Sequence, residues 1–442
     1  MKKCNFMIWL VALIALFAAG AASAGMQLDI EKELRLLRDG KAQKHIGMAR
    51  YRFAVFTFED PDGTGLGNAV ASILSHDLLM NSKVSSVGVL RYVGDLSKAS
   101  GDRQLRYFDK VEPLIESQGV QVAIWGTIRR SGDRVRIDSF MQLSPSVMGT
   151  AFSFSFQMPP AMGAGRLVHR IGPDRMLTQR LELSAEQAGN LATLAANLDR
   201  LRAAPKDSSP VVGQLPLGSV YYLKQRQGVW VQVGTQSGQG GWLRSTGFCT
   251  GPCAPLLSVS RFATELMAYD DRGDIPEYGA RLAPDAKAFS DQLMAVAVLN
   301  GVPDQYAEQE ALYRLDPWCP AKDEATGDKH ATPPGGAAIC NLRAIIRVVG
   351  FSRRTAWQFQ EGLPTENVVR SVVAELALVS MSDPRHVPTL KNLATLFSYL
   401  GDTERAELAS RLAVDAGAAT PDPNYEAAPP DEQHPASPKM KM

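Results

Sequence analysis

The first 24 residues constrain this chain most, because they set the compartment in which it matures. Lys2 and Lys3 make the start positive, and residues 6–17 form an apolar run. Ala22-Ser23-Ala24 then supplies small residues at the positions that a signal peptidase recognises. The run is short for a bilayer core about 30 Å thick, so we expect cleavage after Ala24 and a periplasmic protein. An uncleaved N-terminus that anchors the chain in the inner membrane is the alternative.

Export makes the cysteines a structural constraint. Cys4 lies in the leader, so four of the five cysteines remain: Cys249, Cys253, Cys319 and Cys340. An even number in an oxidising compartment predicts two disulfides, with three possible pairings. We favour the local pairs, because the first two cysteines bracket a Thr-Gly-Pro turn and the last two bracket a polar loop with Pro-Pro-Gly-Gly. Zinc is the rival, but neither pair has zinc-ribbon spacing, and we expect no metal or other cofactor.

Length and composition predict several folded domains. A chain of 442 residues is too long for one core, and 45% apolar and 21% charged residues are typical of globular proteins. The net charge of +1 gives no basic field, which argues against nucleic acid as a partner. Pattern changes divide the chain into a signal peptide (1–24), an N-terminal helix (25–49), an α/β domain with a mixed sheet (50–160), a connecting helical segment (161–205), a small all-β barrel (207–248), an all-α repeat-like domain (254–417) and a disordered tail (418–442).

The clearest local pattern is a hairpin in the α/β domain. Residues 120–130 and 134–143 read as strands that flank residues 131–133, Ser-Gly-Asp. With Ser131-Gly132 as a two-residue loop, Ile128 faces Val135 on the apolar side of the sheet. In the same register Gly126 faces Ile137. Hydrophobic alternation and turn length thus agree on one register.

The polar side of this hairpin carries three arginines, Arg129, Arg134 and Arg136. As a basic surface patch they predict a contact with an acidic partner or a phosphate. The alternative is a solvated sheet face on which Asp133 and Asp138 offset the charge, and ordinary surface electrostatics favour it.

Other polar motifs favour structural roles. Residues 62–67 are Gly-rich but lack the spacing of a phosphate-binding loop, so we expect a turn and a helix cap at Thr64. Ser184 and Gln187 have capping-box spacing at the start of a helix over residues 184–202. The six histidines are scattered, and no pair has helical metal spacing. We therefore assign no catalytic residue.

Residues 53–59 and, above all, residues 122–137 resemble the amino-terminal-type α/β domain of TolB-like envelope proteins. The likeness covers about a quarter of the chain and departs from the family at Phe56, where the family often has proline. This resemblance implies a role in protein interaction or assembly.

Residues 215–220, 228–233 and 241–243 are similar to the strands of a bacterial SH3-like domain. Such domains often bind cell-wall peptides or protein segments. The resemblance therefore gives four ligand-groove candidates, Tyr221, Tyr222, Trp230 and Trp242. In so small a module we favour a core position for the two tryptophans, which leaves Tyr221 or Tyr222 as the better groove candidate.

Residues 392–407 are similar to a tetratricopeptide repeat, and residues 295–317 resemble one more faintly. About three neighbouring repeats are needed for a stable stack, so a divergent helical bundle is the alternative.

Together these patterns predict an exported, non-catalytic envelope protein that serves as a scaffold for a protein or peptide partner. No segment after the leader is long and apolar enough to span a membrane, so contact with the membrane is peripheral at most. A peptidoglycan-associated accessory protein that modulates a wall enzyme is the alternative. A hydrolase with an unrecognised site is a third hypothesis.

Overall fold

The computed structural model describes residues 49–84, 86–92, 119–144, 148–158, 165–172, 175–198, 200–214, 220–235, 240–244, 254–319, 336–359 and 365–419. The predicted signal peptide, the predicted helix up to residue 48 and the chain after Ala419 lie outside these residues. In the described part, no helix has the length and apolarity that a membrane crossing requires. The chain forms two compact units, which we call the sheet unit (Met1–Phe152 and Ile171–Asn300) and the helical unit (Ser153–Arg170 and Gly301–Met442).

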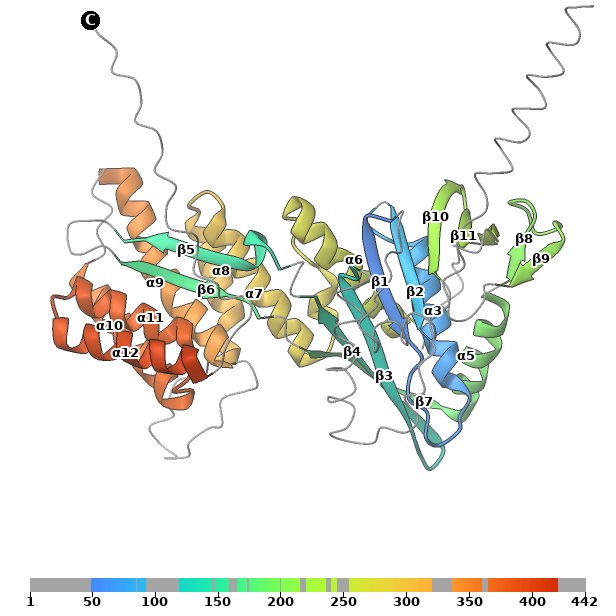
Figure 1. Cartoon of the computed structure of the whole chain (residues 1–442), viewed down its shortest axis with the longest axis horizontal. Coiled ribbons are helices and arrows are strands. Elements are labelled where there is room, and N and C mark those ends of the chain that lie inside the picture. Colours follow the sequence, from blue (N-terminus) through green and yellow to red (C-terminus); the bar gives the residue numbers. More distant parts are fainter. Residues whose placement is uncertain are drawn as a thin grey trace, which may run out of the picture. The chain divides into compact units, whose positions relative to one another are not determined.

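A ten-stranded sheet forms the centre of the sheet unit (Figure 1). Its strands, in spatial order, are β7 (Met176–Ser184), β4 (Arg134–Leu143), β3 (Val122–Ser131), β1 (Tyr51–Phe56), β2 (Val87–Tyr92), β10 (Val220–Gln227), β11 (Trp230–Thr235), β12 (Gly240–Arg244), β8 (Arg200–Arg202) and β9 (Val211–Gln214). The strand β1 pairs in parallel with β2 and β3, and the remaining pairs are antiparallel. The mixed sheet predicted for the α/β region is confirmed.

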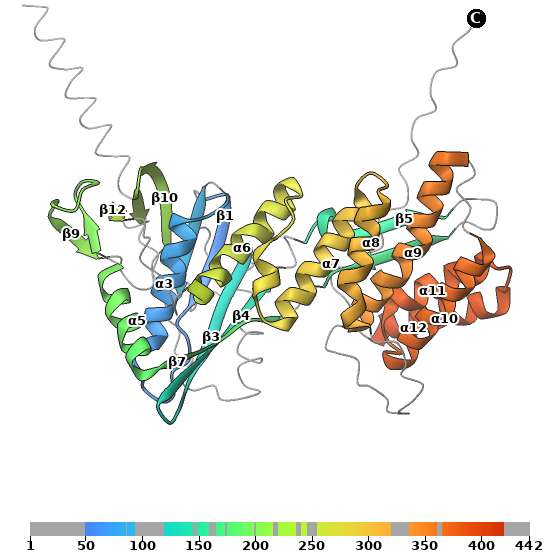
Figure 2. The same ribbon diagram turned by 180° about the vertical axis from the view of Figure 1, so that it is seen from behind.

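Helices cover one face of this sheet, as Figure 2 shows for α3 (Leu66–Met80), α5 (Ala185–Leu198) and α6 (Ala254–Arg272). The unit also contains α7 (Pro284–Asn300) and the short 3-10 helices η3 (Thr150–Phe152) and η6 (Tyr278–Arg281). Val70, Ile73 and Leu74 of α3 are fully buried, as are Phe53, Val89 and Ile124 of the strands. Burial of such side chains is the main stabilising term of a sheet and helix layer.

The hairpin of β3 and β4 has a different register from the predicted one. Ile128 pairs with Ile137 and Ser131 pairs with Arg134, so the loop is Gly132-Asp133. Gly132 has a φ of 62°, and a glycine at the first loop position suits a hairpin turn that needs positive φ there. The predicted register is wrong by two residues. Because this shift is even, the predicted face of each side chain is unchanged, and both isoleucines are buried.

The capping box at the start of α5 is confirmed. The Ser184 backbone N–H donates to Oε1 of Gln187 over 2.9 Å, and the Gln187 N–H donates to Oγ of Ser184 over 3.2 Å. The helix ends at Leu198, earlier than predicted, because β8 begins at Arg200. Two strands, β6 and β7, occupy most of residues 166–184, where a helical segment was predicted.

The helical unit contains a two-stranded sheet and five helices of more than one turn among the described residues (Figure 1). Its elements are β5 (Ser153–Gln157), β6 (Arg166–Arg170), α8 (Gln305–Leu315), the 3-10 helix η7 (Asp316–Trp318), α9 (Gly336–Phe359), α10 (Glu366–Ser382), α11 (Val387–Tyr399) and α12 (Thr403–Ala419). The chain breaks between α11 and α12 at Gly401, where φ is 76°. The strand β5 pairs with β6 in this unit and does not belong to the large sheet.

Buried amide side chains fix β6 to α9 and α11. Asn392 accepts from the Val168 N–H over 2.7 Å and donates to the Val168 carbonyl over 2.9 Å, as a neighbouring strand would. Its Nδ2 also lies 2.8 Å from Oδ1 of Asn341 on α9. Because both asparagines are buried, the loss of either partner would leave a polar group unsatisfied.

Candidate functional site

The strands of the predicted SH3-like region extend the large sheet. Val220, Tyr221 and Tyr222 of β10 pair with β2, and β11 and β12 follow in antiparallel order. Through the pairing of β10 with β2, the strands of this small β region continue the large sheet, so the region is not the separate module that was predicted. The reason is that the free edge of β2 offers backbone groups that β10 satisfies.

Two contacts with α3 hold the region in place. The Arg226 guanidinium donates to the carbonyl of Leu79 over 3.0 Å and to that of Met80, at the C-terminal end of α3. His76 Nε2 lies 3.2 Å from the carbonyl oxygen of Arg244 on β12. Burial lowers the pKa of His76 to about 4, although this backbone contact opposes the shift, so the ring is neutral at pH 7.

Trp230 and Trp242 lie on the side of the sheet opposite Val231, Val233 and Leu243. Cross-strand pairing sets this arrangement, because Trp230 faces Arg244 and Trp242 faces Gln232. Each indole is only 7% exposed, in agreement with a core position. Little of either ring is left for a ligand.

For Tyr221 and Tyr222 the structure describes the backbone pairing. Tyr221 pairs with Val89 and Thr235, and Tyr222 pairs with Gly88 and Gly234. The side chains of both tyrosines lie outside the described residues, so the choice between them as groove residues stays a prediction.

Residues 203–210 form an ordered turn between β8 and β9. The Arg202 guanidinium donates to the carbonyls of Asp207 and Ser209, both over 2.7 Å. The Ala204 N–H donates to Oγ of Ser209 over 2.9 Å, and Asp207 forms an ion pair with Arg244 of β12 at 3.3 Å. The turn is therefore built from side-chain contacts that the region itself supplies.

This turn presents β9 at the end of the described sheet. Among the described strands β9 pairs with β8 alone. Val211 and Val212 are 48% and 55% exposed. An edge strand with exposed β-branched side chains can accept another extended chain through its free backbone groups.

The predicted basic patch is part of a charge network that includes β7. Asp138 accepts from Arg136 over 2.7–3.1 Å and from Arg180 over 2.8 Å. Arg134 forms an ion pair with Glu182 at 3.3 Å. Burial raises the pKa of Asp138, but the hydrogen bonds from the two arginines outweigh it and hold the pKa below its ordinary value.

Arg129 stands directly opposite Arg136 across β3 and β4. It also acts on Glu59: burial raises the pKa of that carboxyl, and the charge of Arg129 lowers it in part. Acidic partners therefore surround these arginines, which favours the solvated charge network over an anion site. Arg180 and Glu182 were not singled out from the sequence, although the alternation of residues 179–183 would have placed them on the polar face of a strand.

Two further buried carboxylates have structural roles. Glu265 of α6 accepts from Nζ of Lys83 over 2.7 Å and from the backbone N–H groups of Glu277 and Tyr278 over 2.9 and 2.8 Å. Asp77 of α3 accepts from Oγ of Ser260 over 2.5 Å. It also accepts from Nδ2 of Asn81 over 2.6 Å. Burial raises the pKa of Asp77, against the effect of these hydrogen bonds.

The Gly-rich segment before α3 is a turn, as expected. Asp60 accepts from the backbone N–H groups of Thr64 and Gly65 over 2.9 and 2.7 Å. The predicted helix cap at Thr64 is wrong, because the N-cap of α3 is Gly65, in the left-handed region and without a side-chain cap. Thr64 makes only a contact of 3.3 Å with the N–H of Leu66. The carboxylate of Asp60 thus occupies the N–H groups that a phosphate would need.

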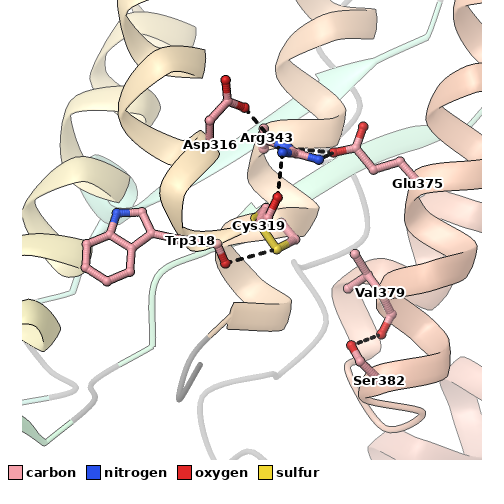
Figure 3. Close-up of a disulfide and its surroundings, with 8 residues drawn as sticks. Asp316, Trp318, Cys319, Arg343, Glu375, Val379 and Ser382 are labelled. Carbon is pink, nitrogen blue, oxygen red and sulfur yellow. Dashed lines mark hydrogen bonds and ion pairs between the residues drawn. A yellow bond between two sulfur atoms is a disulfide. The ribbon is translucent and has the colours of Figure 1, made fainter. Parts of the chain in front are cut away.

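The predicted disulfide between Cys319 and Cys340 is confirmed (Figure 3). It joins the end of η7 to the first turns of α9. Arg343 lies one turn further on and donates to the Cys319 carbonyl over 2.9 Å and to Glu375 of α10 over 2.6 Å. Cys249 and Cys253 lie outside the described residues. Within the described ranges, no three His, Cys, Asp or Glu side chains are grouped as a metal site would require.

Reduction of this disulfide should lower the free energy of unfolding of the helical unit by about 3 kcal/mol. The two cysteines are 21 residues apart, and releasing that loop increases the entropy of the unfolded chain. Urea unfolding of the wild-type chain and of the double variant Cys319→Ser/Cys340→Ser measures the difference. Peptide mapping after alkylation is the control: a wild-type chain in which both cysteines react without reductant would contradict the pairing.

One comparison with known proteins matched part of this region. Residues 196–248 match the family described as the bacterial SH3 domain. The match includes β8 and β9, so it begins earlier than the predicted boundary at residue 207. Searches of curated proteins and of solved structures gave no match for the chain. The TolB-like and tetratricopeptide-like resemblances stay predictions.

Proposed function

We propose that this chain is an exported, non-catalytic envelope protein that holds a protein or peptide partner on its SH3 region. The match of residues 196–248 to the bacterial SH3 domain supports an envelope setting. The observation that carries the proposal is the placement of that region. Its strands continue the sheet of the α/β region and end at β9, whose outer side is unpaired among the described strands.

The hydrogen bonds that order the turn before β9 favour this role. The β8–β9 hairpin is held by Arg202 and by the ion pair of Asp207 with Arg244, and β12 is in turn fixed to α3. A binding edge that is already ordered loses little conformational entropy when a partner arrives. An extended peptide would add to β9 through main-chain hydrogen bonds, and Val211 and Val212 would contact its side chains on the two faces.

The contacts of the buried polar groups support a non-catalytic chain. Asp77, Glu265 and Asp138 each have hydrogen-bond donors that explain their burial. The pKa shifts of Asp77 and Asp138 therefore have a structural explanation, as such shifts often do in ion-pair networks.

A photo-reactive amino acid at position 212 tests the proposal in intact cells. We expect one dominant adduct with an envelope protein, and its loss when Pro replaces Val211, because proline removes a backbone donor from the edge. The same probe at Val302, which is 85% exposed in the helical unit, is the matched control. Equal labelling at both positions, or none at 212, would exclude a docking edge at β9.

The second candidate is a peptidoglycan-associated accessory protein, favoured by the same family match. It predicts that the full mature chain sediments with purified sacculi in the absence of other proteins. Sedimentation with sacculi, together with no adduct at position 212, would favour this candidate over the scaffold.

A further inference from the structure

The last described helix, α12, buries its small residues and exposes its large ones. Ala409, Ala413 and Ala416 are 4–6% exposed, and two of them form an apolar cluster with Leu390 of α11. Leu408 and Leu412 are 50% and 46% exposed. A helix that ends a packed array in solution normally presents a polar outer face. The exposed leucines therefore indicate that a partner covers the outer side of α12.

The outer side of α12 has the spacing of a helix-pairing seam. Arg405, Leu408, Leu412 and Asp415 follow one another at intervals of three, four and three residues. This is the a/d spacing of the heptad repeat, in which the a and d side chains of one helix pack against those of another. All four positions are exposed, and we call them the α12 seam.

The charges at the two ends of the α12 seam determine which partner it can bind and whether that partner helix runs parallel or antiparallel to α12. If two copies of α12 paired in parallel, Arg405 would face Arg405 and Asp415 would face Asp415. In the antiparallel arrangement a positions face d positions, so each Leu408 meets Leu412 of the other copy, and each Arg405 meets Asp415 of the other copy. The seam is thus complementary to itself about a two-fold axis, as an isologous dimer interface requires.

We propose that α12 is a self-association surface, on which a second copy of this chain docks antiparallel through the α12 seam. The residues after Ala419 are the nearest rival occupant within the chain, but they contain Tyr425, Met440 and Met442 as their only large apolar residues. The seam is short, so the interface is small and the dimer is weak, in the range of transient contacts. This inference does not depend on the proposed function of the SH3 region.

Sedimentation velocity on the full mature, oxidised chain tests the dimer over a range of about 1–200 µM. We expect a reversible monomer–dimer equilibrium with a dissociation constant in the micromolar range. The variants Arg405→Glu and Asp415→Arg each place like charges at both ends of the seam, so each should weaken the dimer by about tenfold. The double variant Arg405→Glu/Asp415→Arg restores opposite charges and should return the constant to near the wild-type value.

Local effects of these changes are controlled separately. Arg405 also forms an ion pair with Asp402 and lies over the ring of Phe397, so helicity is measured by circular dichroism for every variant. Leu408→Ser provides a second disruption that leaves all charges in place. A chain that is monomeric throughout the range would overturn the proposal. So would a dimer that none of the variants weakens, or single variants whose effects the double variant does not reverse.

Discussion

Replacing Gly126 with valine should destabilise the sheet unit by about 3 kcal/mol or more. Gly126 lies in the middle of β3, opposite Ser139 of β4. A Cβ atom built there would overlap the Phe58 ring and the backbone carbonyl oxygen of Asp138. The ring is buried and the carbonyl belongs to the sheet, so neither can move away cheaply. Forcing atoms into such a packed position costs about 1–3 kcal/mol, and more where backbone must shift.

Urea unfolding, followed by near-ultraviolet circular dichroism, measures this effect. Gly189→Ala is the matched control, because Gly189 lies on the exposed side of α5 and no atom outside its own helix lies within 4 Å of a Cβ there. Alanine is a better helix former than glycine, so the control should be neutral or slightly stabilising. If Gly126→Val unfolds at the same urea concentration as the wild type, the packing of Phe58 against β3 is wrong.

Local patterns in the sequence predicted local structure well. The Ser184 capping box depends on residues three apart, and the helix begins where the box requires. The β3–β4 hairpin was predicted on the correct faces, because its alternation has a period of two. Its register was wrong, because both Ser-Gly and Gly-Asp can form a two-residue loop and hydrophobic alternation cannot distinguish registers that differ by two.

Pairings between distant segments were beyond these patterns. The strand β10 pairs with β2, about 130 residues earlier in the chain. Neither strand has a sequence pattern that indicates the other as its partner. The same holds for β5 and β6, which lie between strands of the sheet unit in sequence but belong to the helical unit. At the candidate site, the small size of the module was enough to predict the burial of Trp230 and Trp242. The contribution of Arg180 and Glu182 to the charge network could not be predicted without knowing that β7 lies beside β4.

Acid should destabilise the helical unit through His169, which lies at the junction of β6 with the helices. The ring is buried, and Nδ1 lies 3.4 Å from Nδ2 of Asn341. Asn341 in turn contacts Thr389, whose hydroxyl lies 2.7 Å from Nδ1 of His386. Burial, together with a smaller effect of the charge of His386, lowers the pKa of His169 to about 3. Burial also lowers the pKa of His386, against the effect of Asp383.

The direction of the effect follows from proton linkage. In the unfolded chain His169 has a pKa near 6.5 and takes up a proton as the pH falls through that value, whereas in the folded chain it stays neutral down to about pH 3. Stability is therefore full above pH 6.5 and falls between pH 6.5 and 3. The loss is about 1.4 kcal/mol for each pH unit, or roughly 3 kcal/mol at pH 4. His76, with a pKa of about 4, should add a loss of similar size to the sheet unit.

Hydrogen–deuterium exchange at pH 7, 5 and 4, corrected for the intrinsic exchange rate, separates these contributions by location. Peptides from β6 and α11 should lose protection as the pH falls, because protonation places a hydrogen on Nδ1 of His169 opposite the amide of Asn341. His169→Asn removes the titrating group, so its stability should start lower at pH 7 but decline less steeply than that of the wild type. Carboxylates titrate in both chains, so the difference in slope isolates the histidine. Parallel slopes in the two chains would mean that His169 takes up its proton at the same pH in the folded and unfolded chains, which would contradict its burial beside Asn341.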